Sequence, residues 1–318
     1  MQILVSNTSQ TKAIIDLGTN TFHLLIGVLQ QEKWEVVYQQ QIPVMIGAGG
    51  INEGFITPAA FERGIKALEE FYAIIQKFGV SWVVATGTSA IRNAKNGAVF
   101  LAEVKNKFGF EVQQISGDKE AALIYAGVSK SFNFPNEAVV VMDIGGGSVE
   151  LIIGRQNELI WKQSFEIGVA RLLEKFAPSN PITASEIDEI EAYITRELLP
   201  FEKALLEVRD QHKKCEILIG SAGSFETLID VLEVDLKRKS QIISGAAKEV
   251  NRGDAELFYQ FILQSTQQER ENMVGLLPFR VNMIVLAVLL MRHVAKNYGL
   301  TKLIASNYAL KEGLLWEN

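Results

Sequence analysis

The sequence predicts an α/β protein built from two similar domains. Its length is 318 residues, which corresponds to about two domains at roughly 150 residues each. Predicted strands alternate with predicted helices along the chain, as in sheets covered by helices. A strand, a glycine-bearing turn and a second strand occur twice, with Asp16 and Asp143 at the same place in the two copies. Internal duplication at this length predicts two α/β domains that face each other across a cleft.

The first copy opens with an apolar strand at residues 13–15 that ends at Asp16. Polar turn residues follow at 17–21 and apolar residues return at 22–28, a pattern that predicts a β-hairpin. A third strand is expected at 34–38.

A helix is expected to begin after Thr57, because threonine is a good N-terminal cap and Pro58 suits the first turn. Apolar residues at helical spacing continue this helix to about Ile75. The other elements predicted for this half are a strand at 82–86, a helix at 89–107, a strand at 111–115 and a helix from Asp118 to Gly127.

The second copy repeats the opening pattern. A strand at 138–142 ends at Asp143, a turn covers 144–148, the return strand covers 149–153 and a third strand covers 159–167. A capping box at 183–186 opens a long helix. The remaining predicted elements are a strand at 216–219 with a small-residue turn at 220–224, helices near 222–234, 254–270 and 279–297, a strand at 302–305 and a short C-terminal helix.

The domain boundary is expected in the polar stretch 131–137, which contains Pro135. The predicted domains are therefore residues 1–133 and 134–305. The C-terminal helix at 306–318 is expected to pack back on the first domain.

Composition excludes several classes. Hydrophobic residues make up 48% and charged residues 21% of the chain, which is typical of globular proteins and not of disordered or collagen-like chains. The single cysteine, Cys215, excludes an internal disulfide and a four-cysteine zinc site. With only three histidines, a histidine-rich metal site is not expected.

The net charge of −6, from 31 basic and 37 acidic residues, argues against nucleic-acid and anionic-membrane partners. A polyanion in a local basic groove stays open, and the basic run 237–239 is either a solvated surface or a guide for such a ligand. The apolar run 283–291 is shorter than the ~20 residues of a membrane span. Residues 1–12 lack a signal-peptide pattern, so a cytoplasmic location is expected. A homodimer is the default expectation.

The two hairpin tips are the strongest chemical signal. Small residues in such a tip let an anion approach exposed backbone N–H groups, and each tip begins with a carboxylate, a group that suits Mg²⁺. Either tip alone could be an ordinary turn, but two tips with the same carboxylate offset favour a phosphate chain held from both sides. The residues concerned are Asp16, Gly18, Thr19 and Asn20 in the first tip, and Asp143, Gly145, Gly146, Gly147 and Ser148 in the second.

Two glutamates are candidates for acid chemistry. Glu150 is expected beside Asp143 on the opposed strand, where the two carboxylates would share a cation or disturb each other's pKa. The alternative interpretation of Glu150 is an exposed carboxylate on a strand. Glu120 is expected in the first turn of a helix, where it could orient an attacking water as a general base. The alternative interpretation of Glu120 is a glutamate that the helix dipole favours at the start of a helix.

Two further turns could bind phosphate. Thr88 and Ser89 begin a helix whose free N–H groups would suit an anion, and Arg92 adds a bidentate donor. The alternative is a capped helix with a surface arginine. Gly223 and Ser224 belong to another small-residue turn that suits a nucleotide or phosphate, but by itself this turn is a weak signal.

Taken together, these segments resemble the exopolyphosphatase and guanosine-pentaphosphate phosphohydrolase family of the actin-like ATPase superfamily. The resemblance implies two ribonuclease-H-like domains around a cleft, in the short two-domain form. The matching segments, in family order, are residues 13–23, 86–92, 116–127, 141–150 and 220–228, with a weaker match at 306–313.

The resemblance also implies a role for individual residues. Glu120 matches the catalytic glutamate that positions or deprotonates water, and Arg92 matches a phosphate-contacting arginine. Asp143 and Glu150 match the carboxylates that hold the divalent cation, expected to be Mg²⁺. The two tips match the two phosphate loops of the family.

The activity implied is Mg²⁺-dependent release of orthophosphate from the ends of inorganic polyphosphate. Removal of the terminal phosphate of guanosine pentaphosphate is the close alternative. An ATP-using kinase of the same superfamily is disfavoured by the segment around Glu120. A non-catalytic polyphosphate or nucleotide sensor is a third possibility, because Lys119 replaces a glutamate of the family pattern and the segment 280–287 carries Asn282 without the usual aspartate and glycine.

Overall fold

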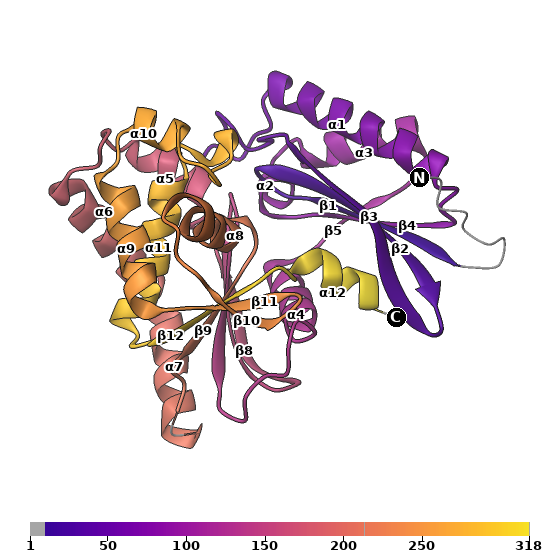
Figure 1. Cartoon of the computed structure of the whole chain (residues 1–318). Helices are drawn as coiled ribbons and strands as arrows, with labels where there is room; N and C mark the ends of the chain where they lie inside the picture. The colour runs from indigo at the N-terminus through magenta and orange to yellow at the C-terminus, as the bar shows by residue number, and fades with distance from the viewer. Residues whose placement is uncertain (1–9, 213, 318) are drawn as a thin grey trace. The chain divides into compact units, whose positions relative to one another are not determined.

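The computed structural model describes residues 10–317 except residue 213, and in it the chain forms two sheets with helices packed against them (Figure 1). The described chain divides into two compact units. The first runs up to Ser116 and is completed by the segment from Lys311 onward, and the second runs from Gly117 to Leu310.

The sheet of the first unit has the strand order β3-β2-β1-β4-β5. Strands β1 (Thr11–Leu17), β2 (Thr21–Gln30) and β3 (Lys33–Pro43) form an antiparallel meander, and β4 (Trp82–Gly87) and β5 (Val112–Gln114) extend it in parallel from β1. This is the arrangement expected of a ribonuclease-H-like domain.

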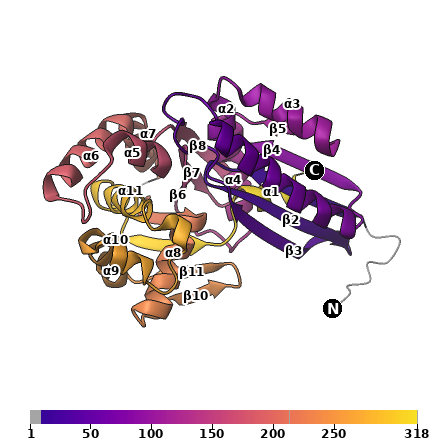
Figure 2. The same ribbon diagram turned by 90° about the horizontal axis from the view of Figure 1, so that it is seen from above.

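Helices cover both faces of this sheet (Figures 1 and 2). Helices α1 (Pro58–Lys77) and α3 (Gly97–Phe108) lie on one face, and the C-terminal helix α12 (Leu310–Trp316) lies on the other. The central strand β1 is almost entirely buried for this reason. Helix α1 begins as predicted, because Thr57 Oγ1 accepts a hydrogen bond from Ala60 N at 3.4 Å.

The sheet of the second unit has the order β10-β11-β12-β9-β6-β7-β8. Its meander consists of β6 (Val139–Ile144), β7 (Val149–Arg155) and β8 (Glu158–Phe165), and its parallel strands are β9 (Ile217–Ser221) and β12 (Lys302–Ser306). These five strands repeat the topology of the first sheet. The hairpin of β10 (Gln241–Ser244) and β11 (Ala247–Val250) then extends the sheet beyond β12.

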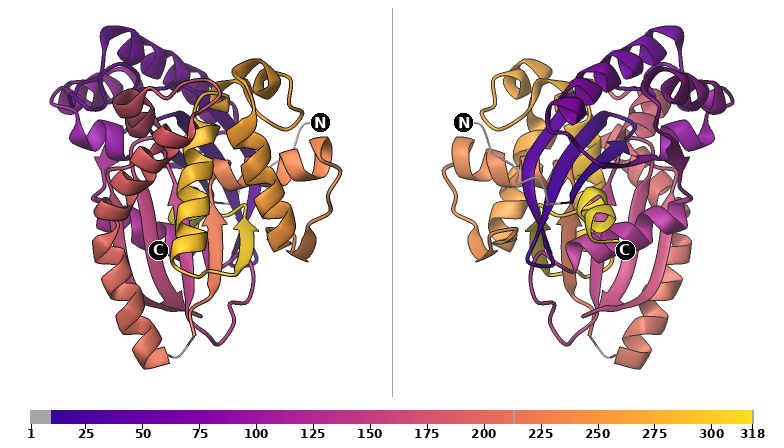
Figure 3. Two further views of the ribbon diagram at one scale, coloured as in Figure 1. Left: turned by 90° about the vertical axis from the view of Figure 1, so that its left-hand side faces the viewer. Right: turned by 90° about the vertical axis from the view of Figure 1, so that its right-hand side faces the viewer.

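Helix α4 (Gly117–Val128) packs on β6, β7 and β8. Helix α11 (Ile284–Asn297) packs against α5 (Val169–Phe176), α6 (Ala184–Glu197) and α9 (Arg252–Gln264) in a separate layer (Figure 3). The apolar run 283–291 is therefore a buried core helix, as predicted. The other helices are α2 (Ser89–Asn93), α7 (Leu199–His212), α8 (Gly223–Asp230), a π-helix (Val231–Asp235), α10 (Gln267–Glu271) and a 3₁₀ turn (Pro278–Arg280).

Several features differ from the expectations. The division falls after Ser116 instead of at 133–134, because α4 packs on the second sheet. The helix expected at 89–107 is interrupted between α2 and α3, and a side chain at Gly97 would meet Ile91 O at 2.4 Å. The β10–β11 hairpin and helix α5 have no counterpart in the predicted elements. Within the described residues, no helix is both long enough and apolar enough to cross a bilayer.

Candidate functional site

Two acidic side chains lie opposite each other at the tip of the second hairpin. Asp143 on β6 and Glu150 on β7 are register partners in the antiparallel pair, and they are only 7% and 1% exposed. Residues on one face of such a pair have their Cβ atoms about 5 Å apart. The prediction that Glu150 stands beside Asp143 is therefore confirmed.

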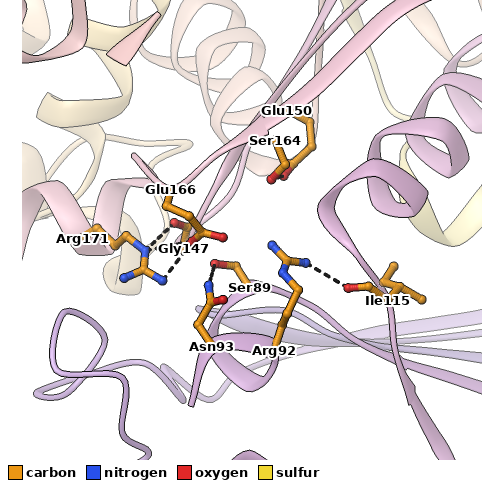
Figure 4. Close-up of polar contacts among 9 residues, drawn as sticks. All are labelled: Ser89, Arg92, Asn93, Ile115, Gly147, Glu150, Ser164, Glu166 and Arg171. Atoms are coloured by element: carbon orange, nitrogen blue, oxygen red, sulfur yellow. Dashed lines mark hydrogen bonds and ion pairs between the residues drawn. The ribbon is translucent and has the colours of Figure 1, made fainter. Parts of the chain in front are cut away.

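A serine from a neighbouring strand orients each of these carboxylates. Ser221, the last residue of β9, donates from Oγ to Asp143 Oδ2 at 2.7 Å. Ser164, the register partner of Glu150 on β8, donates from Oγ to Glu150 Oε1 at 2.6 Å (Figure 4). Both carboxylates are thus fixed by hydroxyl groups of the sheet.

Glu120 belongs to the same electrostatic site. It lies in the first turn of α4 and is 7% exposed, whereas its neighbour Lys119 is exposed. The pKa of Glu150 is raised well above its ordinary value by burial, by the charge of Glu120 and by the charge of Asp143, in that order. Hydrogen bonds from Ser164 and Ser148 oppose this shift. We call Glu120, Asp143 and Glu150 the acid cluster.

The turn beside the acid cluster, residues 145–148, is called the glycine loop here. The carbonyl groups of its three glycines are bound by the start of α5: Val169 N donates to Gly145 O at 3.1 Å, Ala170 N to Gly146 O at 2.8 Å and Gly168 N to Gly147 O at 3.2 Å. The fourth carbonyl, Ser148 O, accepts from Gly145 N at 3.0 Å. Among the residues that the structure describes, the N–H groups of Gly146 and Gly147 have no hydrogen-bond acceptor. A loop with satisfied carbonyls and free N–H groups suits an anion.

The first hairpin tip, in the first unit, also has carbonyl groups that accept hydrogen bonds from a later segment. Thr19 O accepts from Gly47 N at 3.4 Å, and Asn20 O accepts from Val44 N at 3.0 Å and from Met45 N at 2.8 Å. Gly18 follows Leu17, the last residue of β1, and a side chain at Gly18 would meet Thr21 O at 2.8 Å. In both units, therefore, the segment after the third strand binds the carbonyl groups of the tip. The placement of the two tips on opposite sides of a cleft stays a prediction.

The turn before α2 is less open than expected. Thr88 N and Thr88 Oγ1 both donate to Leu17 O at 3.3 Å, so this hydroxyl hydrogen is used within the sheet. Ser89 Oγ accepts from Asn93 Nδ2 at 3.4 Å, and Arg92 donates from a terminal nitrogen to Ile115 O at 3.1 Å (Figure 4). A phosphate role for these three residues stays a prediction.

The small residues at 220–224 have packing roles in addition to any ligand. A side chain at Gly223 would lie 1.9 Å from the Arg280 guanidinium, which donates to Gly223 O at 2.5 Å. Ala222 has φ 65° and ψ −178°, a region that is nearly restricted to glycine and costs about 1–3 kcal/mol. This strained residue lies between Ser221, which binds Asp143, and Gly223. Phosphate binding by Gly223 and Ser224 stays a prediction.

The donor set fits a magnesium ion shared with a phosphate ligand. Within residues 10–317 apart from 213, no group of three or more His, Cys, Asp or Glu side chains could hold a metal ion. Mg²⁺ usually takes one or two carboxylates and completes its shell with phosphate oxygens and water. Asp143 and Glu150 supply two such carboxylates, and their crowded negative charge favours a cation.

Sequence reasoning missed several residues of this site. Ser164 carries no local signal, because a serine in a strand is common. Ser221 stands in the small-residue turn that the sequence singled out, but its contact with Asp143 depends on the pairing of β6 with β9. Gly168 and Arg171 follow the third strand in a segment without a recognised motif, and only the structure brings them to the glycine loop.

The fold and site define a two-unit α/β protein with a glycine loop beside an acid cluster. Comparison with known proteins is consistent with this class. A sequence model of the Ppx/GppA phosphatase family matches residues 28–318. The chain therefore belongs to the Ppx/GppA phosphatase family.

Solved structures and a curated relative agree with this membership. The crystal structure of an exopolyphosphatase from Cytophaga hutchinsonii is 35% identical, with a TM-score of 0.91 over 96% of this chain and 97% of that chain. The Aquifex aeolicus member of the family is 26% identical, with a TM-score of 0.76 over 96% of each chain. A bifunctional 3-dehydroquinate synthase/phosphatase from Fusobacterium nucleatum is 29% identical over 93% of this chain. The chain spans only 44% of the length of that protein.

Proposed function

We propose that this protein is a Mg²⁺-dependent exopolyphosphatase that releases orthophosphate from the ends of inorganic polyphosphate, with Glu120 positioning the attacking water. The observation that carries the proposal is the acid cluster beside a glycine loop whose carbonyl groups are all bound. Family membership and the likeness to the Cytophaga hutchinsonii exopolyphosphatase support it.

The chain's own residues supply the positioning that phosphoryl transfer requires. Glu120 orients a water molecule and accepts its proton as the water oxygen bonds to the terminal phosphorus. The bond from that phosphorus to the bridging oxygen breaks, and the shortened chain leaves with the bridging oxygen as a phosphate oxygen. The N–H groups of Gly146 and Gly147 stabilise the charge on the phosphoryl oxygens.

Asp143 and Glu150 would hold the magnesium ion. When bound, the ion neutralises charge on the transferring phosphoryl group. Ser221 and Ser164 keep the two carboxylates in place, so they contribute through Asp143 and Glu150 and not by contact with substrate.

Guanosine pentaphosphate is the second candidate substrate, because the family that matches the chain covers Ppx and GppA phosphatases alike. The same attack on a terminal phosphoryl group would serve both substrates. A homodimer and a cytoplasmic location stay predictions from the sequence.

The decisive experiment measures orthophosphate release from polyphosphate, guanosine pentaphosphate and ATP, each with Mg²⁺ and with EDTA. We expect Mg²⁺-dependent release that is fastest from polyphosphate. Faster phosphate release from guanosine pentaphosphate would make that nucleotide the assigned substrate instead of polyphosphate. Binding without phosphate release from any of the three compounds would make the protein a sensor.

The base is tested with Glu120→Gln, which keeps the shape of the side chain but cannot accept the proton. General-base catalysis contributes about 10²–10⁴-fold, so we expect a loss of that size while tripolyphosphate still binds in titration calorimetry. Glu189→Gln on α6 is the matched control, since Glu189 is exposed. Wild-type turnover in Glu120→Gln would remove Glu120 from the role of base.

A further inference from the structure

Arg171 on α5 is the side chain that joins the glycine loop to the segment before α5. Its Nε donates to Gly147 O at 2.9 Å and to Glu166 Oε2 at 3.1 Å, and a terminal nitrogen lies 2.9 Å from the same Glu166 oxygen (Figure 4). The arginine side chain is 13% exposed, whereas that of Glu166 is 43% exposed. Glu166 thus holds a mostly buried guanidinium against the loop.

Arg171 contacts the glycine part of the loop, where no side chain limits the backbone conformation. Three consecutive glycines have no side chains that could fix their backbone, and glycine visits more conformations than any other residue. Gly147 O is the carbonyl with two donors, Gly168 N at 3.2 Å and Arg171 Nε at 2.9 Å. These bonds hold the peptide group that follows Gly147.

An arginine suits this task for a geometric reason. Its planar guanidinium presents several donors in a fixed fork, so that it binds a carbonyl group and a carboxylate at the same time. A lysine would bring the same charge as a compact ammonium on a flexible stem, without the fixed planar fork of donors.

We propose that Arg171 is a positioning residue for phosphate binding by the glycine loop, with Glu166 as the partner that holds its guanidinium. This inference rests on the proposed function, because it assigns the glycine loop to the phosphoryl group. Arg171 acts by fixing the Gly147–Ser148 peptide group, which anchors the end of the glycine loop. The two preceding peptide groups, whose carbonyls bind Val169 N and Ala170 N, then present the N–H groups of Gly146 and Gly147 to the anion.

The test compares Arg171→Met, Arg171→Lys and Glu166→Gln with the wild type in steady-state phosphate release and in titration with tripolyphosphate. Residues that orient a ligating group typically matter by 10–100-fold. We expect Arg171→Met to lower kcat/KM by about that factor, with a raised KM and weaker tripolyphosphate binding. Arg171→Lys should recover part of the loss, and Glu166→Gln should change kcat/KM only a few-fold because glutamine still accepts a hydrogen bond.

Arg196→Met is the matched control, since Arg196 forms an exposed ion pair with Glu197 on α6. Circular dichroism at the assay temperature reports the folded fraction of each variant. Wild-type kcat and KM in Arg171→Met would overturn the proposal, and so would a loss that equals the loss of folded protein with KM unchanged.

Failure of the proposed function gives a different result. If the wild type binds tripolyphosphate but releases no phosphate, the enzymatic assignment fails, and Arg171 is judged by the binding titration alone. If the wild type does not bind tripolyphosphate, the glycine loop is not a phosphate loop and the role of Arg171 falls with it.

Discussion

Gly168 is the position at which the contact between α5 and the glycine loop can be broken with one methyl group. A Cβ atom there would lie 2.4 Å from Gly146 O and 2.5 Å from the carbonyl carbons of Gly146 and Gly147. Backbone atoms on both sides would have to separate by about 1 Å to reach an ordinary contact distance of 3.5–4.0 Å. Gly168→Ala is therefore expected to pull α5 away from the loop.

The size of the effect follows from the hydrogen bonds at stake. Three backbone donors, at Gly168, Val169 and Ala170, bind the carbonyl groups of the three loop glycines. At roughly 1 kcal/mol net for each bond, the loss of two or three of them destabilises the second unit by about 2–3 kcal/mol. A unit of this size loses about 2–4 °C of unfolding temperature per kcal/mol, which gives a decrease of roughly 4–12 °C.

The assay is differential scanning calorimetry together with phosphate release at a temperature where the variant is folded. Gly245→Ala is the matched control, because a Cβ atom at Gly245 has nothing within 4 Å. We expect Gly168→Ala to lose both stability and activity, and Gly245→Ala to lose neither. If the two variants unfold at the same temperature and release phosphate at the same rate, the proposed role of α5 is refuted.

Three other variants probe separate parts of the chain. Gly154→Ala would place a Cβ atom 2.2 Å from the Tyr125 hydroxyl and shift α4, so kcat and unfolding temperature should both decrease; unchanged values would show that α4 adapts freely. Lys12→Met removes an ammonium that donates to Leu314 O at 2.9 Å, to Leu315 O at 3.3 Å and to Glu317 O at 3.1 Å. This should cost about 1–3 kcal/mol and speed hydrogen exchange in α12, and wild-type exchange there would contradict the expectation. Burial lowers the pKa of His293 below its ordinary 6.5. As the pH decreases, the unfolded chain therefore binds a proton at His293 before the folded chain does. The free energy of unfolding is highest above about pH 6.5 and falls as the pH decreases from there. Urea unfolding at pH 7.5 and 5.5 should show a smaller difference for His293→Asn than for the wild type, and equal differences would exclude His293 as a cause.

Local sequence patterns predicted the parts of the fold that depend on neighbouring residues. The alternation of apolar strands with glycine-bearing turns gave both hairpins, and Thr57 and Thr183 cap the helices that they were expected to cap. The helix expected at 89–107 was only partly right, because the interruption before Gly97 depends on the close contact with Ile91 O. The β10–β11 hairpin was missed, since β10 is a short and exposed edge strand whose pairing is decided by β11 and β12.

The candidate site shows the same division. Asp143 and Glu150 could be placed together because they flank one hairpin, whose two strands must pair. Ser221 reaches Asp143 from a strand far away in the sequence, and Ser164 reaches Glu150 from the next strand of the meander, so both roles depend on how the strands pair in the sheet. Arg171 reaches Gly147 only because α5 begins directly beneath the loop.

The sequence by itself therefore determined the duplicated α/β plan, the two acid-flanked tips and the resemblance to a phosphohydrolase family, because short-range periodicity and turn chemistry encode them. The tertiary structure decided which unit contains Glu120, which hydroxyls orient the carboxylates and how the loop carbonyls are bound. These features arise from packing between different strands and helices, and a hydrogen bond between two such elements leaves no pattern in the local sequence of either partner.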